Sequence, residues 1–120
     1  MINYSIPKEF ILKNSFIVRA KDSDQNAGEA IFSRSQEGQE GGNVGIWQAL
    51  VNVNKSYLRQ GIGSGLLTTG DSYIHKHHPN DVREFNNQRA PEGYGYKRYT
   101  DRITDTQLIS FEGNCLRFRP

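Results

Sequence analysis

The chain has 120 residues and carries 15 Lys and Arg against 13 Asp and Glu, a formal net charge of +2. A chain of this length forms one domain. Its basic and acidic residues are nearly equal in number, so it lacks the basic excess of a nucleic-acid-binding surface. Its single cysteine excludes an internal disulfide framework and a cysteine-based zinc site, which favours a reducing, cytoplasmic location. The sequence contains no apolar run long enough to cross a membrane and no signal-peptide pattern. We therefore expect one soluble cytoplasmic domain over residues 1–120.

Three segments have the composition of strands. Residues 16–20 are rich in β-formers and lead into a polar turn, and residues 27–34 form a second candidate strand. Residues 44–53 carry apolar side chains on both parities, which predicts a long strand buried on both faces at the centre of a sheet. Between the last two segments, residues 36–43 predict a solvated hairpin loop.

A glycine-rich turn and a helix follow the long strand. Residues 57–65 read Tyr-Leu-Arg-Gln-Gly-Ile-Gly-Ser-Gly, and apolar side chains then recur at helical spacing until Pro79. Residues 83–102 are polar and rich in tyrosine and give no clear prediction. Residues 108–111 and 116–118 predict two short closing strands around a Gly113-Asn114 turn.

The strand, the turn and the helix together predict an anion site. Unpaired N–H groups and the positive end of the helix dipole meet there, and the glycines let a phosphate approach the backbone. A Walker P-loop is excluded because no Gly-Lys-Ser/Thr follows at the required distance. A dinucleotide fingerprint is disfavoured because Leu66 stands where its third glycine belongs. The alternative is that the glycines serve only the packing of the helix.

Residues 51–67, Val-Asn-Val-Asn-Lys-Ser-Tyr-Leu-Arg-Gln-Gly-Ile-Gly-Ser-Gly-Leu-Leu, resemble motif A of the GCN5-related N-acetyltransferase (GNAT) superfamily. Including the two upstream strands, the resemblance covers roughly residues 16–78. It implies an α/β fold of the α+β type, with a central, mostly antiparallel sheet and a β-turn-α motif that binds acetyl-CoA. Only about 15 residues precede the first predicted strand, so the helical region that family members place there is reduced.

The resemblance also implies how acetyl-CoA is held as cosubstrate. Backbone amides of the turn bind the pyrophosphate, and the strand segment Leu50 to Val53 polarises the thioester carbonyl and pairs with the pantetheine arm. Leu58 departs from the Arg or Gln of the family pattern, but Arg59 and Gln60 are adjacent to it. The expected cofactor-binding residues are Val51, Val53, Arg59, Gln60, Gly61, Ile62, Gly63, Ser64 and Gly65.

The catalytic residues are harder to assign. The long strand has no acidic residue, so Glu29 on the preceding strand is the nearest candidate general base; it can equally be an ordinary strand carboxylate, with a water chain accepting the proton. For the general acid, Tyr94 and Tyr96 lie in a segment that loosely resembles the family's second motif, and each can instead be a structural aromatic.

Two other features have simpler explanations than function. His75, His77 and His78 invite a metal site, but they lie at the predicted end of a helix, where cationic side chains favour the dipole, and no metal is expected. Trp47 is expected in the core rather than as a platform for the acceptor.

The resemblance implies an enzyme that transfers acetyl from acetyl-CoA to an amine acceptor, for which the short acceptor side favours a protein lysine or N-terminus. One alternative keeps the fold without the chemistry: a CoA-binding regulator or partner-binding protein, such as a phage protein that blocks host defence. A third reading is an α/β domain of another family with no CoA site. Open sheet edges in so short a chain leave a dimer as a further option.

Overall fold

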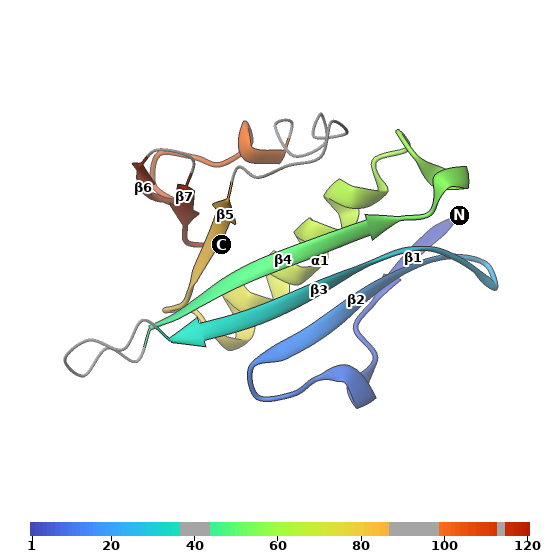
Figure 1. Cartoon of the computed structure of the whole chain (residues 1–120), viewed down its shortest axis with the longest axis horizontal. Helices are drawn as coiled ribbons and strands as arrows, with labels where there is room; N and C mark the ends of the chain where they lie inside the picture. The colour runs from blue at the N-terminus through green and yellow to red at the C-terminus, as the bar shows by residue number, and fades with distance from the viewer. Residues whose placement is uncertain (37–43, 87–98, 113–114) are drawn as a thin grey trace.

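The computed structural model describes residues 1–36, 44–86, 99–112 and 115–120. Seven strands form one sheet with the order β1-β2-β3-β4-β5-β7-β6, and a single long helix packs against it (Figure 1). Two 3-10 turns, η1 (Lys8–Phe10) and η2 (Lys55–Tyr57), interrupt the connections. The helix is α1 (Ile62–His77), and the strands are β1 (Ile2–Ser5), β2 (Ser15–Asp22), β3 (Gln25–Gln36), β4 (Gly45–Val53), β5 (Val82–Asn86), β6 (Leu108–Glu112) and β7 (Cys115–Phe118).

The strands predicted at residues 16–20, 27–34, 108–111 and 116–118 and the helix before Pro79 are all present, the strands extended by one to four residues. The expected mixed fold with a mostly antiparallel sheet is confirmed, since only β4 and β5 pair in parallel. Strands β1 and β5 were not predicted. They are short, and one residue of β5, Arg83, is a charged side chain that only the tertiary fold buries. Of the region before β2, only η1 is helical.

Helix α1 covers one face of strands β1 to β4. The core between them is built from alternate residues of β2 and β3, which include Phe16 and Phe32 in stacked contact, and from Leu66 and Ile74 of the helix. Gly70 lets the helix approach the sheet, because a Cβ there would lie 2.1 Å from the ring of Phe32. This close approach fixes the helix over the central strands.

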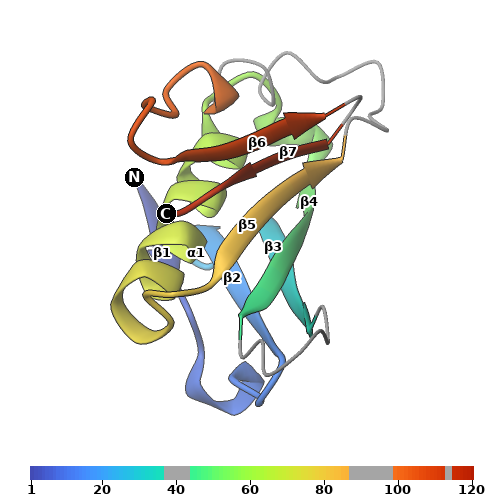
Figure 2. The same cartoon turned by 90° about the vertical axis from the view of Figure 1, so that its left-hand side faces the viewer.

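The other face of the same strands is open within the described part of the chain (Figure 2). The prediction that residues 44–53 are buried on both faces is therefore wrong beyond Trp47: the burial of β4 alternates from there on, and Leu50 is 69% exposed. The reason is that no helix of the described segments lies over this side, so apolar side chains on it stay in contact with water. None of the described helices, α1 included, has the length and apolar character to span a membrane.

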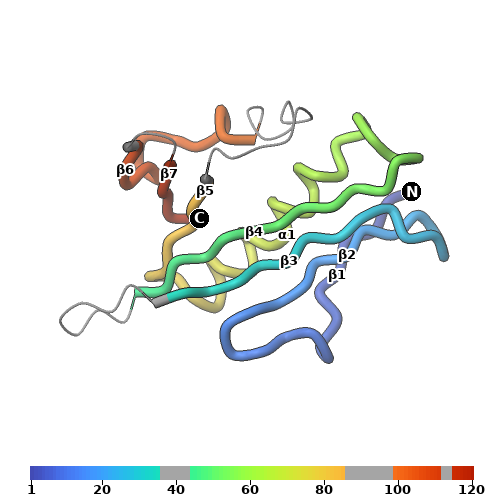
Figure 3. Tube along the Cα trace, in the orientation of Figure 1, coloured from blue at the N-terminus to red at the C-terminus, as the bar shows by residue number. Residues whose placement is uncertain are grey.

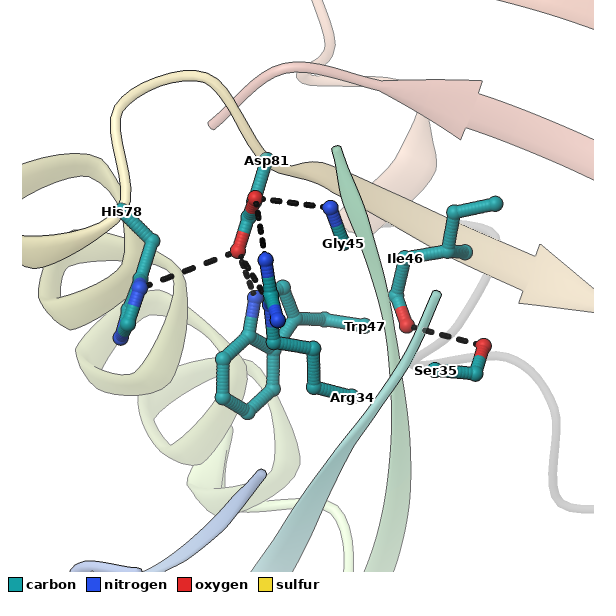
Figure 4. A network of polar contacts seen from close by, with 7 residues as sticks. All are labelled: Arg34, Ser35, Gly45, Ile46, Trp47, His78 and Asp81. Carbon is teal, nitrogen blue, oxygen red and sulfur yellow. Dashed lines mark hydrogen bonds and ion pairs between the residues drawn. The ribbon is translucent and has the colours of Figure 1, made fainter. Parts of the chain in front are cut away.

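A buried carboxylate joins the central strands of the sheet to the end of the helix. Asp81, just before β5, accepts hydrogen bonds from Arg34 Nε at 2.8 Å, Gly45 N–H at 2.8 Å and Trp47 Nε1 at 2.9 Å (Figure 4). His78 at the end of α1 lies 3.8 Å from the same carboxylate. Asp81 thus connects β3, β4 and the helix at the point where β5 begins. Trp47 is 1% exposed, which confirms it as a core residue.

A second buried network holds the C-terminal strands on the helix. Arg83 of β5 is fully buried, donates from Nε to Asp71 of α1, and lies among the rings of Phe32, Phe85 and Phe118. The hydroxyl of Tyr99 donates to the other oxygen of Asp71. Burial raises the pKa of Asp71 and also that of Tyr99, whose hydroxyl faces the Asp71 carboxylate. Tyr99 is therefore a structural residue that fastens the segment before β6 to the helix.

Candidate functional site

The turn between β4 and α1 has an unusual backbone. Gly61, the N-cap of α1, has φ +77°, and Arg59 has φ +64°, a left-handed conformation that costs a non-glycine residue free energy. The first helical hydrogen bond runs from Gly65 N–H to Gly61 O at 3.0 Å. The N–H groups of Ile62, Gly63 and Ser64 therefore have no partner within the helix and lie at its positive end.

The approach to this turn is anchored on the opposite hairpin. Asn54 donates its backbone N–H to Ala27 O at 2.9 Å, and its side chain accepts from Ser56 N–H at the start of η2. Tyr57 donates its hydroxyl to Asp22 Oδ2 at 3.0 Å. These contacts hold the chain between β4 and α1 in place before any ligand arrives, so little ordering is left for binding to bring about.

The three turn glycines have different surroundings. A Cβ on Gly61 would meet nothing within 4 Å, and one on Gly63 would make ordinary contacts with Val51 and Val53 at 3.8 and 3.9 Å. A Cβ on Gly65 would lie 2.1 Å from the ring of Tyr4 in β1. Gly61 thus supplies the left-handed conformation and Gly65 the close packing of the helix, while Gly63 is required by neither.

Strands β4 and β5 separate soon after they meet. They pair only at Ile46 with Val82 and at Trp47 with Arg83, and then diverge (Figure 3). Alternate residues of a strand direct their N–H and C=O groups toward opposite neighbours, so the stretch Leu50 to Val53 points half of its backbone groups into this opening. An extended molecule that enters the opening meets an edge of β4 that pairs with no other described strand, and the start of α1 at its far end.

A polar cluster lies where the two strands separate. Glu84 of β5 accepts from Gln48 Nε2 of β4 at 2.6 Å and from Arg117 Nε of β7 at 2.9 Å. Burial acts to raise the pKa of Glu84, but the hydrogen bonds from Gln48 and Arg117 outweigh it and leave this pKa below its ordinary value. The carboxylate is therefore ionised at neutral pH. The sequence does not indicate Glu84 as a site residue, because no strand was predicted at the position of β5.

The predicted base Glu29 lies elsewhere. It pairs in register with Asn52 of β4 and faces the open side of the sheet, on the far side of β4 from the opening. It lines a hollow of about 240 Å³ together with Asn26, Gly28, Asn52 and Asn54. The structure therefore places Glu29 beside a polar hollow on β3 and β4, one strand away from the point of divergence.

The remaining candidates have the following positions. Tyr94 and Tyr96 fall outside the described residues, as does the Gly113-Asn114 turn. The histidines make three separate contacts: His75 with Pro120 O at 2.8 Å, His77 with the ring of Tyr73, and His78 with Asp81. His77 and His78 both lie near the ring of Tyr73, whereas His75 contacts the C-terminal residue.

No protein-family model and no curated protein matches the sequence, but solved structures match the fold. The chain is similar to a Desulfovibrio desulfuricans protein assigned to the GNAT family of acetyltransferases, with a TM-score of 0.52 and 15% identity over 89% of this chain and 69% of that one. It is similar to a mutant AtaT toxin bound to the C-terminus of the antitoxin AtaR and acetyl-CoA, with a TM-score of 0.66 and 10% identity over 99% of this chain and 93% of that one. It is also similar to Arabidopsis thaliana NAA60 in complex with acetyl-CoA, with a TM-score of 0.53 and 16% identity over 86% of this chain and 74% of that one.

The matched structures agree with the resemblance found in the sequence. At identities this low, similar structures share architecture, whereas function depends on the residues of the site. In this chain the site consists of a strand that leaves its neighbour, a left-handed turn and a helix whose first N–H groups have no partner within the helix. The chain therefore has the fold of the GNAT acetyltransferases.

Proposed function

We propose that this protein transfers an acetyl group from acetyl-CoA to an amine. The observation that carries the proposal is the continuity of the site: β4 separates from β5 after Trp47 and leads directly into the turn whose helix begins at Ile62. The opening between the strands accommodates an extended arm, and the helix start accommodates an anion at the end of that arm.

The pantetheine arm and the pyrophosphate of acetyl-CoA each have matching groups in the protein. The backbone of Val51 and Val53 pairs with the amides of the pantetheine arm, as an added strand does. The N–H groups of Ile62, Gly63 and Ser64 bind the pyrophosphate, and the side chains of Arg59 and Gln60, both exposed, supply a charge and a hydrogen-bond donor beside it. Gly61 and Gly65 contribute through the shape of the turn and the packing of the helix.

The chemistry needs a polarised carbonyl, a neutral amine and a proton for the thiolate. A backbone N–H of β4 within Leu50 to Val53 polarises the thioester; the amine nitrogen then bonds to the carbonyl carbon, and the carbon–sulfur bond breaks. Glu84 attracts the incoming ammonium group, but its low pKa makes it a weak base, so the proton leaves the amine through water. Tyr94 and Tyr96 are the proposed donors of a proton to the departing thiolate.

The acceptor side is wide enough for a large molecule. The open face of β2 to β4 adjoins the point where the strands separate, and no described helix covers it (Figure 2). A protein lysine or N-terminus can approach such a face without entering an enclosed pocket. We therefore extend the proposal to an amine carried by a bulky acceptor.

Thermal unfolding with and without CoA tests the binding half of the proposal. A ligand at about 100 times its Kd adds about 2.7 kcal/mol to the free energy of unfolding, which corresponds to a rise in Tm of roughly 10 °C for a chain of this size. Gly63→Asp places a carboxylate against the pyrophosphate and abolishes the rise, whereas Gly63→Ala, whose Cβ makes ordinary contacts, keeps most of it. No shift with wild type at millimolar CoA would contradict the proposal.

Release of free CoA in the presence of amines, peptides and proteins tests the chemical half. The wild type releases CoA from acetyl-CoA, and Tyr94→Phe or Tyr96→Phe lowers kcat about tenfold or more if that hydroxyl protonates the thiolate. Unchanged turnover in both variants would remove the tyrosines from the mechanism. Tight CoA binding with no release for any acceptor would favour a CoA-binding regulator instead.

A further inference from the structure

The hollow on the open face of the sheet has a distinctive lining. Asn26, Asn52 and Asn54 supply amide groups, Gly28 contributes its backbone, and Glu29 supplies the one charge of the lining. Amide oxygens and a carboxylate are hydrogen-bond acceptors, so the lining suits a ligand group that donates several hydrogen bonds and carries positive charge.

Glu29 has a basic neighbour but does not pair with it. Arg19 of β2 lies directly opposite Glu29 in the register, where opposite charges commonly form an ion pair. The guanidinium instead lies over the ring of Phe10, 4.6 Å from its centroid. Within the described part of the chain, the Glu29 carboxylate has no ion pair and no hydrogen bond. It is half-buried in the hollow and free to meet a cation from outside.

An apolar strip separates this hollow from the opening between β4 and β5. Leu50 is 69% exposed and lies two residues before Asn52 on the same face of β4, with Ile31 opposite it on β3. From the opening beside Leu50 to Glu29 is two strand spacings across and two residues along, or about 12 Å. A molecule that reaches from one to the other crosses Leu50.

We propose that the hollow binds a second cationic group of the acceptor, about 12 Å from the amine that receives the acetyl group. Glu29 and the amide oxygen of Asn52 hold this group, and the apolar stretch between the two nitrogens packs on Leu50. The proposal rests on the proposed function for the place of the first amine. The chemistry is that of an ammonium or guanidinium group, whether on a polyamine or on a basic side chain of a peptide.

The same distance argues against Glu29 as the general base. Proton transfer to a side chain requires hydrogen-bond distance, about 3 Å, or one intervening water. At about 12 Å from the opening, Glu29 is too far for either. Its charge therefore acts on binding and specificity, and its replacement is expected to change KM rather than kcat.

A series of straight-chain diamines measures the spacing directly. An extended chain advances about 1.2 Å per bond, so about eight to ten carbons between the nitrogens span the distance. Wild-type enzyme is expected to show its lowest KM at that length, about tenfold below the KM of the monoamine of equal length, since one charge-assisted hydrogen bond is worth about a factor of ten. Glu29→Gln raises the KM of the best diamine to that of the monoamine.

Matched controls separate this effect from a general change of charge. Asp105→Asn removes a carboxylate from an exposed turn after Ile103 and leaves the length preference as in the wild type. Leu50→Ser weakens the binding of long diamines and monoamines alike. A KM that does not depend on diamine length, or a length preference that survives Glu29→Gln, would overturn the subsite.

Calorimetric binding of the same amines makes the result independent of turnover. A diamine preference that Glu29→Gln removes supports the subsite even if no CoA is released, in which case only the proposed function fails. Equal affinities for diamine and monoamine overturn the subsite even where acetylation proceeds. Lysine peptides with a second basic residue about four positions away, compared with alanine there, show whether peptides share the preference with polyamines.

Discussion

At the scale of the residue, the carboxylate of Asp81 holds the central strands of the sheet together. Its carboxylate accepts from Arg34, Gly45 N–H and Trp47 and is nearly inaccessible to water. Burial acts to raise the pKa of Asp81, but the hydrogen bonds from Arg34, Gly45 and Trp47 outweigh it and leave this pKa below its ordinary value. A carboxylate that is easier to ionise in the folded state stabilises that state when ionised.

The sign of this shift sets the pH range in which Asp81 stabilises the fold. Its contribution is fully present above the pKa of an unfolded aspartate, about 3.9, and is lost as the pH falls through the lower folded value. Asp81→Asn leaves buried donors without their acceptor and is expected to cost about 3 kcal/mol at pH 7, with a smaller cost in acid. Urea unfolding across pH measures both, with Asp24→Asn in an exposed turn as control; an equal cost at all pH values would contradict the assignment.

At the scale of the element, α1 combines two demands in one short segment. Its first turn must expose N–H groups, and the same turn must pack closely on β1 and β4. Gly65 satisfies the second demand, since any side chain there meets the ring of Tyr4, and Gly70 does so further along against Phe32. Gly63 lies on the same helix with room for a methyl group. A glycine run that reads as a single signal in the sequence therefore has separate physical reasons at each position.

Two alanine substitutions distinguish these reasons. Gly63→Ala is expected to be neutral or to stabilise by about 0.5 kcal/mol, because alanine favours the helix and its Cβ fits. Gly65→Ala is expected to destabilise by about 1–3 kcal/mol, because its Cβ forces Tyr4 to move. Urea unfolding of both, and of Gly65→Ala combined with Tyr4→Ala, measures the difference. Strictly additive effects in the double variant would show that the two residues do not interact.

At the scale of the whole molecule, the sheet has two parts joined at a narrow place. Strands β1 to β4 form one part and β5, β7 and β6 the other, with backbone pairing between them only at Ile46 and Trp47 (Figure 1). Side-chain contacts from Asp81, Glu84 and the Asp71–Arg83 pair strengthen this junction. Beyond it the opening leaves backbone groups of β4 without a neighbouring strand among the described residues.

A ligand that fills the opening changes the exchange of those backbone amides. With saturating CoA we expect hydrogen exchange at the amides of Leu50 to Val53 that face β5 to slow at least about tenfold, because new hydrogen bonds form there. Exchange at β1, on the far edge of the sheet, is expected to stay the same. Mass spectrometry of exchanged peptides provides the measurement. Protection spread equally over both regions would point to general stabilisation rather than to binding in the opening.

Local patterns in the sequence determined most of the secondary-structure elements of this protein. Alternating apolar residues, the glycine turn and the apolar spacing before Pro79 were enough to place β2, β3, β4 and α1, the two closing strands and the turn between β4 and α1, because each of these depends on neighbours in the chain. The same patterns were enough to indicate the acetyltransferase fold.

Contacts between distant residues decided the rest. Strand β5 is held by Asp81 and by the Arg83–Asp71 pair, which join residues that no local pattern connects. The exposure of Leu50 follows from the absence of a second layer among the described elements, and the separation of Glu29 from the opening follows from the register of β3 on β4. Whether a carboxylate accepts a proton or binds a cation depends on its distance to the reacting atoms, and the fold alone sets that distance.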